Sequence, residues 1–277
     1  MLETLRELFS YDFMMYAVIV GALISLCASL LGVSLVLKRF SMIGDGLSHV
    51  GFGTMAIAAV MGVAPLYLSI PVVVLCAFLL LRVNESGHVK GDAAIGLIST
   101  GALAIGVMVI STSSGMNIDI YNYMFGSILT MSKSDVILSV ILSAAVLILF
   151  AVFYNSIFAV TFDENFSHAT GTNTKLFNML IAALTAVTIV VGMRIMGAML
   201  ISSLLIIPPL SSMRLCKSFK SVVICSCIIS LVCFFSGVII SCLFETPTGA
   251  SVVCVNLGVF VILSGVRAML HRPVKTA

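Results

Sequence analysis

The sequence predicts an all-α membrane protein, a polytopic bundle of about eight to nine transmembrane helices. Of the 277 residues, 61% are hydrophobic and only 9% are charged, whereas a soluble domain carries about 25% charged residues. The apolar residues form blocks close to the roughly 20 residues that cross about 30 Å of hydrocarbon. In lipid these blocks must be helical, because no water is available to satisfy an exposed backbone group.

Hydropathy predicts nine spans along the chain. The first apolar run is about 25 residues long, which is too long for a cleaved signal peptide, and no small-x-small cleavage site follows it. It should therefore remain as a membrane anchor. The second and sixth spans are short and could tilt, break or merge with a neighbour. We expect residues 1–277 to form a single transmembrane domain whose spans cover residues 13–37, 46–62, 65–81, 93–111, 135–153, 177–192, 195–210, 221–243 and 249–268.

Basic residues gather on one side of this arrangement. With nine spans, one face receives Lys38, Arg39, Arg82, Lys90, Lys175, Arg214, Lys217, Lys220, Arg272 and Lys275. The positive-inside rule makes that face cytoplasmic, so the N-terminus lies outside and the C-terminus inside. Asp12, the polar stretch 111–135 and the turn 245–249 fall on the opposite face, where only Lys133 and Arg194 break the pattern. The alternation indicates an odd number of spans.

Eight cysteines do not predict a disulfide framework or a metal cluster. Seven of them lie inside apolar blocks without a C-x-x-C pair, where each acts as a small hydrophobic residue: Cys27, Cys76, Cys225, Cys227, Cys233, Cys242 and Cys254. The formal net charge of +3 is small, and we expect no nucleic-acid partner.

One ionisable pair stands at the start of the second span. Asp45 and His49 are four residues apart, so they share one face of a helix. Small residues surround the pair and permit close approach of neighbouring helices: Gly44, Gly46, Ser48, Gly51 and Gly53. Carboxylate and imidazole suit zinc, manganese or ferrous iron, and two copies meeting at a two-fold axis would supply four ligands. Spacing alone equally allows Asp45 to cap the helix while His49 bonds a neighbouring span.

Six segments occur in order along nearly the whole chain, at residues 38–49, 92–106, 123–129, 162–171, 196–208 and 245–250. Together they resemble the permease subunits of the ABC-3 family, the metal-type importers for zinc, manganese or iron. In the first segment Gly46 stands where alanine is usual, and Pro209 and the serines at 211–212 stand where alanines are common. These departures put no function in doubt.

The resemblance implies a homodimer in the bacterial cytoplasmic membrane, in contact with lipid, that transports a divalent metal ion and holds no permanent cofactor. It also implies a separate pair of cytoplasmic ATPase subunits and an extracellular metal-binding lipoprotein. The family's Gly-Asp-x-x-Ser-His motif belongs to its metal pathway and matches Asp45 and His49 here, which favours the metal role over the cap. The choice among zinc, manganese and iron stays open.

A cytoplasmic loop of about residues 154–176 resembles the family's coupling helix, which fits a groove in the ATPase. The chain contains no G-x-x-x-x-G-K-[ST] phosphate loop, so ATP hydrolysis is expected on the partner and this chain is not itself an enzyme. The loop is amphipathic around Phe162, Phe166 and Ala169. Its expected coupling residues are Asp163, Glu164, Phe166, His168, Ala169 and Gly171, with Asp163 and Glu164 a solvated or partner-facing acidic pair and Gly171 the end of a short helix.

Other functions compete with this interpretation. A secondary, proton-coupled transporter would use Asp45 and His49 as a proton or ion relay. A membrane sensor or scaffold is disfavoured by the lack of a sizeable soluble domain, and a membrane enzyme by the lack of a nucleophile–base arrangement. The outer loop 117–123, which carries Asp119, fits either an aromatic belt or a contact with the binding protein.

Overall fold

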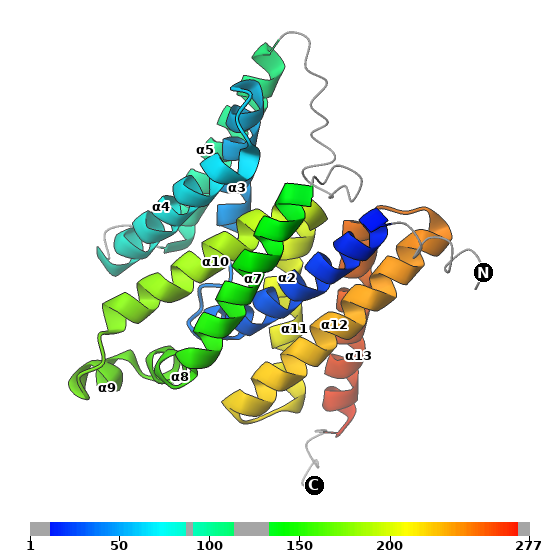
Figure 1. The fold of residues 1–277 in the computed structure, drawn as a ribbon. Helices are drawn as coiled ribbons and strands as arrows, with labels where there is room; N and C mark the ends of the chain where they lie inside the picture. Colours follow the sequence, from blue (N-terminus) through cyan, green and yellow to red (C-terminus); the bar gives the residue numbers. More distant parts are fainter. Residues whose placement is uncertain (1–11, 87–90, 114–132, 271–277) are drawn as a thin grey trace, which may run out of the picture.

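The computed structural model describes residues 12–86, 91–113 and 133–270, and every regular element within them is a helix (Figure 1). The loop 117–123, with Asp119, lies outside these residues. The described residues form eleven helices in this order: α2 Asp12–Leu37, α3 Ile43–Val60, α4 Pro65–Ser86, α5 Gly91–Thr112, α7 Lys133–Val152, α8 Tyr154–Phe162, α9 Glu164–Ala169, α10 Thr174–Met196, α11 Ala198–Leu215, α12 Phe219–Phe244 and α13 Thr248–Leu270.

The predicted fold class is confirmed, because each of the nine predicted spans corresponds to one of the long helices. Eight of these helices are long and apolar enough to cross a membrane. The exception is α3, whose 18 residues include Asp45, His49 and four glycines, which together lower its hydropathy. At 1.5 Å per residue α3 is still about 27 Å long, close to the thickness of the hydrocarbon layer.

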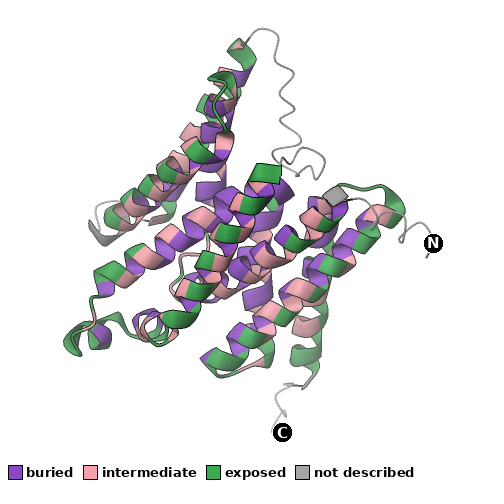
Figure 2. Ribbon diagram, viewed as in Figure 1, coloured by how far each residue is buried: buried purple, intermediate pink, exposed green. Residues whose placement is uncertain are grey.

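The helices divide into central and peripheral ones (Figure 2). In the most apolar 18-residue stretch of α2 and of α10, 67% of the residues are buried, whereas this share is 17% in α5 and 22% in α13. The exposed faces of the peripheral helices carry large aliphatic side chains such as Leu97, Ile141 and Val261. Exposed apolar surface on this scale is what lipid covers in a membrane protein.

The ends of the helices fall on two faces of the bundle (Figure 1). The α8–α9 segment, the α11–α12 turn and the end of α13 lie at one end, and the start of α2 and the α12–α13 connection lie at the other. The basic residues of the α11–α12 region, Arg214, Lys217 and Lys220, therefore share a face with the α8–α9 segment. The positive-inside rule predicts the cytoplasm on this face.

On the opposite face the structure gives Arg194 a partner. Arg194 Nη2 in the last turn of α10 lies 3.7 Å from Asp135 Oδ2 in the first turn of α7, and the two side chains are 17% and 21% exposed. A neighbouring carboxylate compensates this positive charge. Arg194 therefore breaks the charge pattern much less than the sequence alone suggests.

A proline residue in α11, Pro209, explains an unusually close helix contact. Pro209 has no N–H group and leaves the carbonyl oxygen of Leu205 without its helical donor. Gly32 of α2 packs directly against that carbonyl, where an added Cβ atom would collide with it. A glycine at position 32 is therefore required by the approach of α2 to a carbonyl that α11 leaves open.

A single residue separates α10 from α11. Gly197 has φ of 85° and ψ of 157°, a backbone conformation open almost only to glycine. The chain changes direction there, so the sixth and seventh predicted spans are adjacent but distinct helices. All eight cysteines lie within the described residues, and each is free.

Candidate functional site

Asp45 and His49 lie one turn apart near the start of α3. Asp45 Oδ2 is 3.7 Å from His49 Nε2, and the side chains are 47% and 23% exposed. The carboxylate belongs to the first turn of the helix, where the N-terminal end of the macrodipole favours negative charge. The side chain of the N-cap residue, Met42, makes no capping hydrogen bond, and the Asp45 carboxylate faces the His49 imidazole. The pair thus presents one oxygen and one nitrogen ligand on a partly open surface.

Small residues bring the neighbouring helices close to α3 on its other faces. A Cβ atom added to Gly53 would lie 2.5 Å from the carbonyl oxygen of Ala102 on α5, and one added to Gly46 would lie 2.6 Å from Ile95 Cγ2 on the same helix. Gly106 of α5 in turn faces the Cα atom of Gly53. The contact between α3 and α5 is therefore made partly by backbone against backbone.

Other small residues of α3 face α10 and α11. A Cβ atom on Gly51 would lie 2.7 Å from Met193 Cε of α10, and one on Gly44 would lie 2.9 Å from Leu205 Cδ1 of α11. The Ser48 hydroxyl donates to the Gly44 carbonyl at 2.8 Å, and its oxygen lies 3.2 Å from that of Ser202 on α11. These contacts fix the rotation of α3 about its own axis.

That rotation decides where Asp45 and His49 point. Gly44 and Ser48 face α11, whereas Gly46 and Gly53 face α5. Successive residues of an α-helix are about 100° apart, so the pair occupies the sector of α3 that lies between these two neighbours. The pair is therefore presented on a surface of the chain between α5 and α11, neither packed into the core nor aimed at a single neighbour.

One chain cannot complete a metal site with this pair. Within the described residues there is no group of three or more His, Cys, Asp and Glu side chains that could hold a metal ion. Zinc and manganese sites in proteins use four or more ligands. The arrangement can therefore supply half of a tetrahedral site, and the remaining ligands must come from elsewhere.

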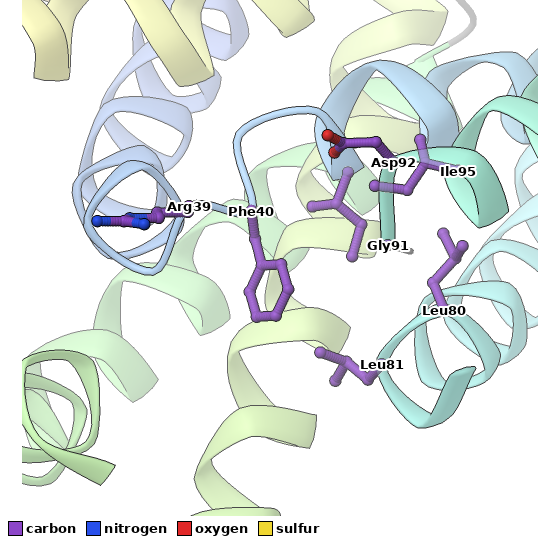
Figure 3. Close-up of a pocket in the computed structure, with 8 residues that line it drawn as sticks. Arg39, Phe40, Leu80, Leu81, Gly91, Asp92 and Ile95 are labelled. Atoms are coloured by element: carbon purple, nitrogen blue, oxygen red, sulfur yellow. The ribbon is translucent and has the colours of Figure 1, made fainter. Parts of the chain in front are cut away.

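A pocket of about 140 Å³ lies beside the first turn of α3 (Figure 3). Among the described residues that line it, Asp92 is the only acidic one, and Arg39 points away from Leu80 and Leu81. One carboxylate among aliphatic side chains is a poor cation site, so the pocket is better described as loose packing around the α2–α3 turn. Its lining residues are Arg39, Phe40, Ile43, Leu80, Leu81, Gly91, Asp92 and Ile95.

The segment 154–176 folds as two short helices and the start of α10. Asp163 separates α8 from α9, and its Oδ1 atom accepts a hydrogen bond from the N–H of Phe166 at 2.8 Å. At the other end of α9, the N–H groups of Gly171 and Thr172 bond the carbonyls of His168 and Ser167, with Gly171 at φ of 86°. This is a Schellman motif, which needs glycine at that position. Asp163 and Gly171 thus set the two ends of α9.

Two phenylalanines project from this segment. Phe162 is 59% exposed and Phe166 65% exposed, while Val160, Thr161 and Ser167 are buried against the bundle. His168 and Ala169 are also exposed. The exposed rings of Phe162 and Phe166 thus form an aromatic surface on this segment, and the ring of Phe162 also packs against Phe158 and Phe219.

Glu164 is exposed to solvent on one side and bonded to the bundle on the other. Its side chain is 49% exposed and contacts two residues outside α9. Its Oε2 atom lies 3.4 Å from Lys38 Nζ, and its Oε1 accepts from Asn178 Nδ2 at 2.8 Å. Lys38 also donates to Asn178 Oδ1. Lys38 and Asn178 have no local sequence signal for this role, because 126 and 14 residues separate them from Glu164.

Comparison with known proteins assigns the family. The model of a family described as the ABC 3 transport family matches residues 10–267. The chain belongs to the ABC 3 transport family. Its helical fold resembles that of PsaBC from Streptococcus pneumoniae in complex with Fab, with a TM-score of 0.84 at 25% identity over 94% of each chain.

Named relatives within the ABC 3 transport family are membrane proteins of metal uptake systems. The high-affinity zinc uptake system membrane protein ZnuB of Haemophilus influenzae is 28% identical over 91% of this chain and 97% of its own length. ZnuB of Buchnera aphidicola is 32% identical over 84% and 89%, and the manganese transport system membrane protein MntC of Halalkalibacterium halodurans is 24% identical over 92% and 88%. The chain is therefore a multi-pass membrane permease of the ABC transport type.

Proposed function

We propose that this chain is the channel-forming subunit of an ATP-driven importer that carries a divalent metal ion, zinc, manganese or iron, into the cytoplasm. The names of the zinc and manganese relatives support the class of substrate. Zinc, manganese and ferrous iron all accept carboxylate and imidazole ligands, so the choice among them depends on geometry and on the protein that delivers the ion.

The observation that carries the proposal is the partly exposed pair of Asp45 and His49 on α3. Each chain offers two ligands on a surface between α5 and α11. When two copies associate about a two-fold axis beside this surface, the two pairs together form a site with two carboxylates and two imidazoles. Such a site fills the four-coordinate shell of a transition metal.

The face with the α8–α9 segment is the cytoplasmic face in this proposal. The basic turn between α11 and α12 lies on it, as the positive-inside rule requires. The exposed rings of Phe162 and Phe166 there dock into a groove of a separate ATPase subunit. An extracellular metal-binding lipoprotein delivers the ion to the opposite face.

Transport depends on a metal site that two permease chains share, because relative movement of the chains changes the site. ATP binding draws the two docking segments together and opens the outer side, and hydrolysis returns the permease to an inward-open state. A change in the distance between the two halves of the site weakens binding and releases the ion. The two states must differ in affinity for the metal, because a metal ion bound equally well by both states would not change the equilibrium between them.

The test is metal uptake by the permease, its ATPase and its binding protein reconstituted in liposomes. Replacing Asp45 or His49 by Ala should abolish ATP-dependent uptake of radioactive zinc or manganese. Asp92→Asn is the matched control, because Asp92 is an exposed carboxylate in the first turn of α5. Uptake that survives the double Asp45→Ala, His49→Ala replacement would refute the role of the pair.

The same liposomes separate primary from secondary transport. Uptake should stop when ATP is removed while a proton gradient is maintained. If uptake instead follows the proton gradient and needs no ATPase subunit, Asp45 and His49 act as a proton relay and the chain is a secondary transporter.

A further inference from the structure

From the contacts of Lys38 we infer that this residue is a positioning residue: it ties the ATPase-docking segment to the helix that carries the metal ligands. The inference rests on the proposed function and adds a route by which movement at α9 reaches Asp45. Lys38 immediately follows α2, and its ammonium group bonds both Glu164 of α9 and Asn178 of α10. Three separate parts of the chain therefore meet at this side chain.

The burial of Lys38 makes the contact specific. Its side chain is only 8% exposed, whereas that of Glu164 is 49% exposed. An ammonium group removed from water needs a charged or hydrogen-bonding partner, because its desolvation is costly. Glu164 and Asn178 supply these partners, and the 2.8 Å bond between them closes the triangle. Ion pairs on an exposed surface contribute little to stability. The Lys38–Glu164 pair differs from these, because Lys38 is buried and Asn178 bonds both partners.

The turn from Lys38 to α3 transmits displacement because its backbone is fixed by hydrogen bonds. The N–H of Phe40 bonds the Leu35 carbonyl at 2.8 Å, and the N–H of Ile43 bonds the Phe40 carbonyl at 3.0 Å. Arg39, at φ of 61°, takes the left-handed conformation that ends α2. Seven positions separate Lys38 from Asp45, so a shift of the ammonium moves the first turn of α3.

Space for such a shift lies on the far side of the turn. Phe40 and Ile43 line both the pocket of about 140 Å³ against α4 and α5 (Figure 3) and a much smaller one of about 10 Å³ against Lys38 and Asn178. Asn178 of the Lys38 cluster also lines a separate hollow of about 510 Å³ against α4. The turn and the cluster thus both border open space, which leaves room for the turn to move.

The experiment compares Lys38→Met with Lys175→Met in the reconstituted transporter. Lys38→Met removes the ammonium but leaves Glu164 half exposed to water, so folding should tolerate it. Lys175 is an exposed lysine in the first turn of α10, close in sequence to Asn178 but outside the cluster. The measured quantity is the number of metal ions moved per ATP hydrolysed, together with metal binding by the purified permease.

We expect Lys38→Met to lower transport per ATP by about tenfold, within the range typical of coupling between sites, while metal affinity and ATP hydrolysis stay near wild type. Lys175→Met should leave the ratio unchanged. The charge-swapped double variant Lys38→Glu, Glu164→Lys should recover coupling that each single replacement loses. A merely structural role would instead lower the melting temperature and metal binding together with transport.

An unchanged ratio in Lys38→Met, or a charge swap that fails to recover it, overturns the inference. The outcome is separable from that of the metal site. If Asp45→Ala abolishes uptake and Lys38→Met does not alter coupling, the role of Lys38 fails and the proposed function stands. If Lys38→Met uncouples transport while Asp45→Ala, His49→Ala leaves uptake intact, the proposed metal site fails and the role of Lys38 stands.

Discussion

Gly53 of α3 packs so closely against Ala102 of α5 that a Cβ atom added to the glycine would lie 2.5 Å from the alanine's carbonyl oxygen. This contact is between backbones, so no rotation of a flexible side chain can relieve it. Together with Ser48 against α11, it holds α3 in the rotation that presents Asp45 and His49 between α5 and α11.

Gly53→Ala should therefore destabilise the permease by about 1–3 kcal/mol, the usual range for overpacking a filled interior. The measurement is thermal unfolding of the purified protein in detergent. Gly101→Ala on α5 is the control, because a Cβ atom there meets no atom within 4 Å. Equal melting temperatures for the two variants would contradict the close approach of α3 and α5.

The break at Gly197 leads to a second prediction. Because φ of 85° with ψ of 157° is strained for any residue with a side chain, Gly197→Ala should lower stability by about 1–3 kcal/mol. Gly96→Ala, another position with open space around it, provides the comparison in the same unfolding measurement. If Gly197→Ala is as stable as Gly96→Ala, the α10–α11 junction does not have this backbone conformation.

The pairing of Arg194 with Asp135 predicts energetic coupling at the face opposite the docking segment. Arg194→Met and Asp135→Asn should each destabilise the protein, and the double variant should lose less than the sum, with a coupling of about 0.5–3 kcal/mol. Lys133→Met, at an exposed lysine two residues before Asp135, should change stability little. Strictly additive losses would show that the two charges do not interact.

The aromatic surface of the α8–α9 segment predicts where the ATPase subunit binds. Phe166→Ala should weaken that binding by about 30-fold, the loss expected when a buried interface anchor of about 2 kcal/mol is removed. It should not change the melting temperature of the isolated permease, because the ring is 65% exposed there. Binding measured by surface plasmon resonance at the wild-type level would place the ATPase elsewhere.

Hydropathy predicted the number and order of the long helices well, because burial in lipid depends on composition over whole spans. It located their ends less well. The sixth span, expected at 177–192, is α10 over Thr174–Met196. Asn173 starts that helix by accepting a hydrogen bond from the N–H of Leu176, a cap that hydropathy does not register. The pair Asp45 and His49 was visible because both residues lie within one helical turn.

Long-range relationships were outside the reach of the sequence. Nothing near Lys38 in the chain indicates that its partner is Glu164, and nothing near Arg194 indicates Asp135. Glu164 was expected to face solvent or a partner because it opens a short helix in a polar loop, yet packing of α9 against α10 turns it toward Lys38 and Asn178. Such contacts arise from the tertiary fold, which brings distant charges to the same helix ends.

The most direct measurement of the central claim is the metal content of the purified, assembled transporter, determined by equilibrium binding of radioactive zinc or manganese. We expect one metal ion per two permease chains, with affinity reduced about 100-fold or more by Asp45→Ala or His49→Ala, since even groups that only hydrogen-bond to a metal ligand contribute about 10–100-fold. One ion per chain, or undiminished binding in the double variant, would contradict a site shared between the Asp45–His49 pairs of two copies.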